Sequence, residues 1–351
     1  MDFGYYLPCY WPDTSYPMQN MYREMVAEAQ FAEELGYCSF TIPEHHFTNA
    51  LVHPDALLSA VHIAAHTKRV PVITATTVLP FHNVPQLAGQ IAQADCLTNG
   101  RIQVGVGRGA YRYEFKRLQI PYDNARERFA DSLDLLVDLL SKEDVSWDSD
   151  FYKIPATTIT PRPVQKPHPK IWFAATTPGA IEYAAGRSFP VMTTPLRESF
   201  DKVVAQATAF QNGRAKSEGS KEHLKLSMLI MLFVTDGRRQ TEELVRHALG
   251  RHRRFVNVFG GEGEVERGAI KPYDVDLTEA DIERNLIIGP PEVCVDRLKA
   301  YAELGIDEIQ LNMNFGASHA EVMRSLEMFA TQVMPHFAPK REEELLRQVH
   351  G

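Results

Sequence analysis

Three adjacent residues, Glu44, His45 and His46, place a carboxylate beside two imidazoles directly after the strand-like run 39–43. Imidazole changes its protonation near neutral pH, so this stretch suits proton transfer. In a barrel of parallel strands, active sites are built from residues that follow the carboxyl ends of the strands. Chemistry and position together favour general acid–base catalysis.

Two other interpretations of these histidines stay open. A metal site is conceivable because His62 and His66 form a second pair at helical spacing. However, that helix reads His-Ile-Ala-Ala-His, without the glutamate of the zinc-hydrolase motif, and we predict no metal. The other interpretation is that the histidines only pack in the core or face water.

The segment Gly105-Val106-Gly107-Arg108-Gly109-Ala110 follows a strand and matches Gly-x-Gly-x-x-Ala. In a dinucleotide fold, this loop opens a helix at once. Here the next helical pattern begins only near Asn124. We therefore interpret the glycines as positions of close backbone approach, and Arg108 as a ligand for an anion.

Two more features indicate an anion site. Arg126 lies at the start of the helix that follows Asn124, and Thr176-Thr177 precedes Pro178 after the strand that ends at Ala175. A hydroxyl residue followed by proline marks a helix N-terminus, which attracts phosphate. Plain helix capping explains the two threonines equally well. Together with Arg108, these residues predict a phosphate pocket on one face of the barrel.

The chain that positions these residues alternates strand-like and helical segments. The strands are mostly apolar without strict alternation, as expected of parallel strands covered on both faces. Eight such repeats predict a (β/α)8 TIM barrel. The strand candidates are 3–7, 39–43, 70–78, 101–105, 170–175, 190–194, 226–234 and 307–313.

We expect a single barrel domain over 1–337 with two insertions and a charged tail over 338–351. Residues 145–169 are rich in proline and aromatic residues, and predict a hairpin followed by a stiff loop. Residues 251–289 form a longer segment of the kind that serves as a lid or stays disordered. Capping signals bound the helices: Gly36 ends the first, and Ser318 and Glu321 open the last, which Pro335 ends.

Composition excludes several functional classes. The 351 residues carry a formal charge of −8 and show no basic stripe, which argues against nucleic acid as a partner. No window approaches the roughly 18 consecutive apolar residues of a membrane span, and no leader is apparent. The four cysteines lie far apart, as in a reduced cytoplasmic protein.

The chain resembles the bacterial luciferase-like family of flavin-dependent monooxygenases over about residues 3–337. The similarity rests on several motifs in the same order. They are Phe-Gly in the first strand, Glu44-His45-His46-Phe47-Thr48, Thr74-Ala75-Thr76-Thr77-Val78-Leu79-Pro80, Gly100-Arg101, Arg108-Gly109-Ala110-Tyr111, Asp123-Asn124-Ala125-Arg126 and Pro161-Arg162-Pro163-Val164-Gln165-Lys166-Pro167.

The resemblance implies a barrel in which reduced FMN, delivered by a separate reductase, and molecular oxygen oxidise a small organic substrate, expected to be an apolar, carbonyl-type compound. It also implies a homodimer. His45 matches the histidine implicated in proton transfer, with Glu44 orienting or tuning it. The Ala75-Thr76 bond matches a cis peptide beneath the flavin. The cofactor contacts expected from the resemblance are Ala75, Thr76, Arg108, Tyr111, Arg126, Ala175, Thr176 and Thr177.

The chain departs from the luciferase α subunit at two positions, because Gly107 stands for a cysteine beside the flavin and Thr176 for an acidic residue. Both departures count against light emission. The family also includes enzymes that use the deazaflavin F420, and proteins that only hold flavin, so both alternatives stay open. An oxygenase site must exclude water. We expect apolar walls from aromatic residues near strand ends: Tyr5, Tyr6, Tyr10, Trp11, Phe47 and Phe81.

Overall fold

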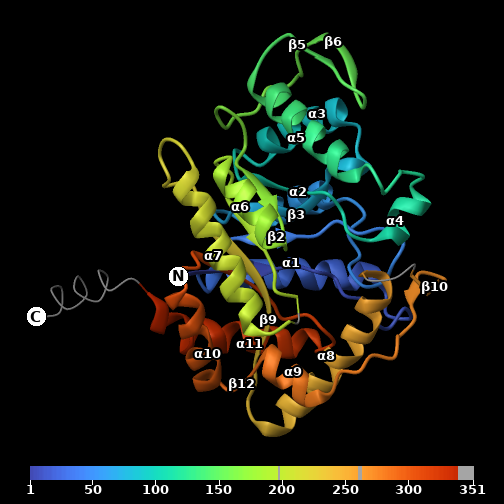
Figure 1. The fold of residues 1–351 in the computed structure, drawn as a ribbon. Coiled ribbons are helices and arrows are strands. Elements are labelled where there is room, and N and C mark those ends of the chain that lie inside the picture. The colour runs from blue at the N-terminus through green and yellow to red at the C-terminus, as the bar shows by residue number, and fades with distance from the viewer. Residues whose placement is uncertain (197, 260–262, 339–351) are drawn as a thin grey trace, which may run out of the picture.

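Eight parallel strands form a closed barrel in the computed structural model of the chain (Figure 1), which describes residues 1–196, 198–259 and 263–338. Around the barrel the order is β9-β13-β1-β2-β3-β4-β7-β8, and β8 pairs back to β9. The predicted TIM barrel is therefore confirmed. Its strands are β1 (Asp2–Tyr6), β2 (Phe40–Ile42), β3 (Val72–Val78), β4 (Ile102–Gly107), β7 (Ile171–Ala174), β8 (Val191–Thr193), β9 (Leu226–Val234) and β13 (Glu308–Asn312).

Each of the eight predicted strands overlaps one of these. Helices surround the barrel, and most follow a strand in the chain. They are α1 (Met18–Glu34), α2 (Ala56–His66), α3 (Val84–Leu97), α4 (Arg112–Arg117), α5 (Ala125–Ser141), α6 (Pro178–Gly186), α7 (Phe200–Lys216), α8 (Arg238–Phe259), α9 (Glu279–Asn285), α10 (Pro291–Glu303) and α11 (His319–Gln332), with 3-10 turns η1 (Leu79–Phe81) and η2 (Met334–Phe337).

The capping signals in the sequence position these helices. Ser318 and Glu321 form the predicted capping box of α11, which ends at Gln332, before the predicted stop at Pro335. Gly36, just after α1, has φ of +92°, a conformation that glycine adopts without steric cost. Helix α5 begins at Ala125, as expected. The short helix α4, which precedes it, was not predicted.

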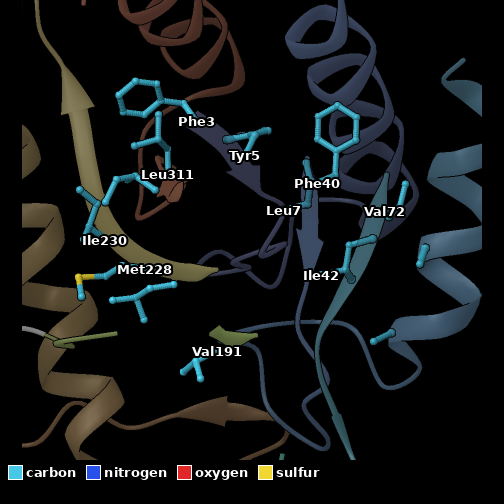
Figure 2. Close-up of a cluster of buried hydrophobic side chains, with 14 of the residues drawn as sticks. Phe3, Tyr5, Leu7, Phe40, Ile42, Val72, Val191, Met228, Ile230 and Leu311 are labelled. Atoms are coloured by element: carbon cyan, nitrogen blue, oxygen red, sulfur yellow. The ribbon is translucent and has the colours of Figure 1, made fainter. Parts of the chain in front are cut away.

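Alternate residues of each strand face opposite sides of the barrel wall. In β1, the Tyr5 hydroxyl donates to Glu28 of α1 at 2.6 Å, whereas Tyr6 lines a cavity inside the barrel mouth. Figure 2 shows the outward layer, in which buried side chains fill the space between strands and helices. Each such side chain contributes about 1.5–3 kcal/mol by leaving water. The labelled members are Phe3, Tyr5, Leu7, Phe40, Ile42, Val72, Val191, Met228, Ile230 and Leu311.

The predicted hairpin in 145–169 is present as antiparallel β5 (Val145–Asp148) and β6 (Lys153–Thr157). The segment 251–289 is not the long loop that the sequence suggested. It begins as the last turns of α8 and continues as the hairpin β10 (Val265–Glu266) and β11 (Ala269–Ile270), then α9. It ends in β12 (Ile287–Gly289), an unpredicted strand parallel to β9. Helical periodicity continues past Arg251 because Phe255 and Val258 extend the apolar face of α8.

Residues 260–262, which lie within the predicted insertion, are outside the described residues. So is the predicted charged tail, apart from its first residue. Among the described helices, none combines the length and the apolar composition needed to cross a membrane.

Candidate active site

A cavity of about 990 Å³ lies at the carboxyl ends of the barrel strands. Its volume is at the upper end of the ~300–1,000 Å³ typical of ligand sites. All ten predicted site residues line it, so the structure brings together positions spread over more than a third of the chain. They are Glu44, His45, Ala75, Thr76, Arg108, Tyr111, Arg126, Ala175, Thr176 and Thr177.

His45 lies in the cavity wall just after β2, with 19% of its side chain exposed. Its Nδ1 is 3.0 Å from Oε1 of Glu114, and its ring stacks on Tyr111 with centroids 4.3 Å apart. The same Glu114 oxygen accepts the backbone N–H of His46 at 2.7 Å. A carboxylate that holds Nδ1–H leaves Nε2 as the nitrogen that can exchange a proton with a ligand.

The carboxylate partner of His45 is thus Glu114, and the prediction that Glu44 orients His45 is wrong in this respect. Glu114 stands on the unpredicted helix α4, and no sequence signal connects it with a histidine 69 residues earlier. Glu44 accepts hydrogen bonds from other groups instead. Its oxygens are 2.9 Å from His46 Nε2, 3.0 Å from His82 Nε2 and 2.9 Å from the Val78 N–H.

The Glu44 network joins the loops after β2 and β3. Burial alone would raise the pKa of Glu44, but hydrogen bonds from His46, His82 and Val78 outweigh it and hold that pKa below its ordinary value of 4.5. Burial opposes the charge of His82, yet the hydrogen bond and charge of Glu44 raise the pKa of His82 above 6.5. Glu44 and His82 therefore each stabilise the charged form of the other.

This charge pair predicts a pH-dependent contribution to stability. Because the pKa of His82 is raised, its charge stabilises the fold fully below pH 6.5, and this stabilisation is lost as the pH rises through the folded-state pKa. Because the pKa of Glu44 is lowered, its charge stabilises the fold fully above pH 4.5. We expect His82→Gln to lower the free energy of unfolding by about 1–2 kcal/mol between these limits, and by less once the pH has risen above the folded-state pKa of His82. Urea unfolding across this range checks it, and an equal loss at every pH would contradict it.

Strand β3, which lines the cavity beside β4, contains the predicted cis peptide bond at Ala75-Thr76. The register of the two strands shifts there. Two glycines of β4 allow its backbone to pack closely against β3. A Cβ on Gly105 would lie 2.1 Å from the Thr74 carbonyl oxygen, and a Cβ on Gly107 would lie 2.8 Å from Thr76 Oγ1. Both glycines lie within β4, which supports close backbone approach rather than a dinucleotide loop.

One end of the cavity is built to receive an anion. Arg108 donates only to the Gly109 carbonyl and the Tyr122 hydroxyl, and within the described residues no carboxylate pairs with Arg108 or Arg126. Thr177 is the N-cap of α6 but makes no side-chain capping bond. Plain capping therefore does not account for it. The Gly179 N–H also has no partner in the described part of the chain. A phosphate fits this set of donors.

The end of α8 lines the cavity, and the β10–β11 hairpin packs against it. Tyr111, Val258 and Ile270 form a separate apolar cluster there, and Figure 1 shows α4, α8 and β10 close together. The buried side chain of Asn49 fastens the hairpin, because its Oδ1 accepts the Ile270 N–H at 3.0 Å. The Asn49 N–H donates to the Gly268 carbonyl at 2.8 Å.

The aromatic walls differ from the expectation. Tyr6 and Tyr10 line the cavity, but the other four predicted residues do not. Tyr5 is buried and bonds to Glu28, and Phe81 packs on Phe115. Trp11 donates to the Tyr16 carbonyl, and Phe47 is half exposed. The apolar lining instead includes side chains that the sequence did not single out: Phe129, Leu133, Phe173, Tyr183, Met192, Leu229, Phe255 and Phe259.

The second histidine pair, His62 and His66, lies on the exposed face of α2, with ring centroids 4.5 Å apart. Across the residues that the structure describes, no three His, Cys, Asp or Glu side chains gather in a way that could hold a metal ion.

Comparison with known proteins places this geometry in a family. The model of the luciferase-like monooxygenase family matches residues 1–308. The chain is 31% identical to the oxygenase component of a flavin-dependent trigonelline monooxygenase of Acinetobacter baylyi, over 92% of each chain. It is 26% identical to an FMNH2-dependent dimethylsulfone monooxygenase of Pseudomonas putida, over 88% of this chain and 85% of that one. A solved monooxygenase from Streptomyces bottropensis superimposes with a TM-score of 0.82 at 26% identity, over 96% and 100% of the chains.

Proposed function

Because the chain belongs to the luciferase-like monooxygenase family, we propose that it is the oxygenase component of a two-component system. A separate reductase supplies reduced FMN, and the chain uses it with molecular oxygen to oxidise a small organic substrate. The name of the Acinetobacter baylyi relative, an oxygenase component, supports this division of labour. The observation that carries the proposal is a cavity lined both by Arg108 and Arg126, which have no carboxylate partner among the described residues, and by a carboxylate-bound histidine.

The cofactor assignment rests on the fit between the cavity and FMN. The phosphate would be held by Arg108, Arg126 and the N-terminus of α6, and the ring system would lie against the Ala75-Thr76 bond. Bound reduced FMN supplies the electrons that activate oxygen. The chain supplies binding, orientation and a dry site.

In this proposal His45 is the catalytic residue. Glu114 fixes Nδ1, and Tyr111 fixes the plane of the ring, so Nε2 holds or moves the proton that oxygen activation requires. Glu114 is a positioning residue. Glu44 supports the adjacent loops through His46 and His82 and keeps its predicted place in the site, but not by contact with His45.

Exclusion of water depends on the hairpin that Asn49 fastens. Asn49→Ala removes the acceptor of the Ile270 N–H and is expected to destabilise the closed mouth by about 1–3 kcal/mol. Bound reduced FMN should then react with oxygen roughly fivefold faster or more. Stopped-flow absorbance of the flavin measures this rate, and Asn212→Ala, on the exposed face of α7, is the control. Identical rates in the Asn49 variant and the wild type would show that the hairpin does not protect the site.

The proposal is tested by mixing the protein anaerobically with reduced FMN and adding a pulse of oxygen. Slow return of the oxidised-flavin spectrum, compared with free FMN, is the expected result and justifies a substrate screen. Return at the protein-free rate would reject the oxygenase. Comparing the binding of reduced F420 and reduced FMN then separates a deazaflavin enzyme from a protein that only holds flavin.

A homodimer and a cytoplasmic location belong to the same proposal. The four cysteines, all at described positions, are free thiols, which supports a reducing compartment. Sedimentation of the purified chain measures the oligomeric state.

A further inference from the structure

A buried arginine that the proposed function does not use lies at the mouth of the barrel. Arg251, on α8, is only 8% exposed and lines the cavity. Its Nη1 contacts the sulfur of Met231 at 3.6 Å, and its guanidinium lies 5.3 Å from the centre of the Tyr10 ring. These are weak contacts for a buried cation, because burying a charge without a partner is costly.

Within the described residues, no carboxylate pairs with Arg251. The two buried glutamates of the cavity, Glu44 and Glu114, already bond to histidines. Arg251 Nε is buried and has no hydrogen-bond partner in the described part of the chain. In most proteins a buried charge is neutralised by a partner, but the described part of the fold provides no such partner for Arg251.

A polar group beside Met231 also lacks a partner. Asn312 lies next to Met231 in the β13–β9 register, and its Oδ1 is buried without a partner among the described residues. Farther along the cavity wall, the hydroxyls of Ser227 on β9 and Thr193 on β8 are also buried and unpartnered among the described residues. Buried polar groups normally find partners, so the unpartnered Arg251 and Asn312, which both adjoin Met231, indicate where a polar ligand group binds.

Arg251 and Asn312 lie on other elements than the phosphate end. Arg251 rests on Met231 of β9 and on Tyr10 after β1, whereas Arg108 and Thr176 follow β4 and β7. The barrel order places β4 opposite β13, which carries Asn312, and β7 opposite β1, which Tyr10 follows, while β9 lies two strands from β7. A cofactor anchored by its phosphate at one side therefore leaves Arg251 for a second molecule.

We propose that Arg251, with Asn312 beside it, binds a carboxylate of the substrate, so that the substrates are small organic anions rather than the neutral carbonyl compounds that the sequence suggested. This inference rests on the proposed function, because it assigns the substrate class of the same cavity. A planar carboxylate matches the guanidinium geometry and neutralises its charge. Tyr6 and Tyr10 supply aromatic surface for the rest of the molecule.

The test compares acids with neutral amides of the same shape. Calorimetry of the full chain, saturated with FMN to fill the phosphate end, measures binding of benzoate against benzamide and of hexanoate against hexanamide. We expect at least one acid to bind on the order of 30-fold more tightly than its amide. Arg251→Met should abolish this preference, and Arg251→Lys should retain part of it. Arg253→Met is the matched control, because Arg253 lies on the same helix but does not line the cavity.

The outcomes separate the inference from the proposed function. The inference is overturned if no acid is preferred, if the preference persists in Arg251→Met, or if Arg253→Met loses it equally. It is also overturned if Arg251→Met weakens FMN binding instead. If FMN does not bind but the preference for acids is present and depends on Arg251, the anion site stands and the proposed cofactor fails. Circular dichroism confirms folding, and Arg251→Lys replaces Arg251→Met if the latter does not fold.

Discussion

Replacement of His45 by alanine is expected to lower the yield of oxygenated product by about 10²–10⁴-fold while the protein still folds and binds FMN. The loss is large because Nε2 of His45 is the proton-exchanging atom that Glu114 and Tyr111 hold in place. Folding should persist because the side chain stands in the cavity wall, outside the apolar core. Product formed per reduced FMN consumed measures the effect, with peroxide as the competing product.

Glu114→Gln provides the comparison that identifies the role of the histidine. The amide preserves the shape but removes the charge that favours a protonated Nδ1, so the optimum of the pH–rate profile should move while part of the activity remains. A merely structural role would lower activity equally at all pH values. An undiminished product yield in His45→Ala would remove this residue from the mechanism.

Much of this site could be predicted from the sequence because barrel geometry is regular. Residues at the carboxyl ends of parallel strands meet at one rim, wherever they stand in the chain. Glu44 and His45 follow β2, Arg108 follows β4 and Thr176 follows β7, so identifying the strands was enough to place these residues around one cavity.

The residues that were missed depend on contacts that no local pattern encodes. Glu114 reaches His45 only because α4 turns its side chain toward the loop after β2. Arg251 was grouped with a loop, although it lies on the continuous helix α8. The last turns of this helix line the cavity. Tyr5 was placed in the wall, but the alternation of side chains along β1 turns it outward to Glu28.

The second large effect is expected at the phosphate end. Arg108→Met should weaken FMN binding by about one to two orders of magnitude, because a charged hydrogen bond to phosphate contributes about 1.5–3 kcal/mol. Arg112→Met is a close control. The Arg112 guanidinium lies 4.2 Å from the centre of the same Tyr122 ring that Arg108 contacts, yet Arg112 does not line the cavity.

Riboflavin makes this prediction specific to the phosphate, since it carries the same ring system without that group. Titration by fluorescence quenching should give equal riboflavin affinities for wild type, Arg108→Met and Arg112→Met, whereas FMN affinity should fall only in Arg108→Met. A parallel loss of riboflavin binding would mean that Arg108 shapes the cavity instead of binding phosphate. The anion site would then consist of Arg126 and the Gly179 N–H at the start of α6, because these donors also lack partners among the described residues.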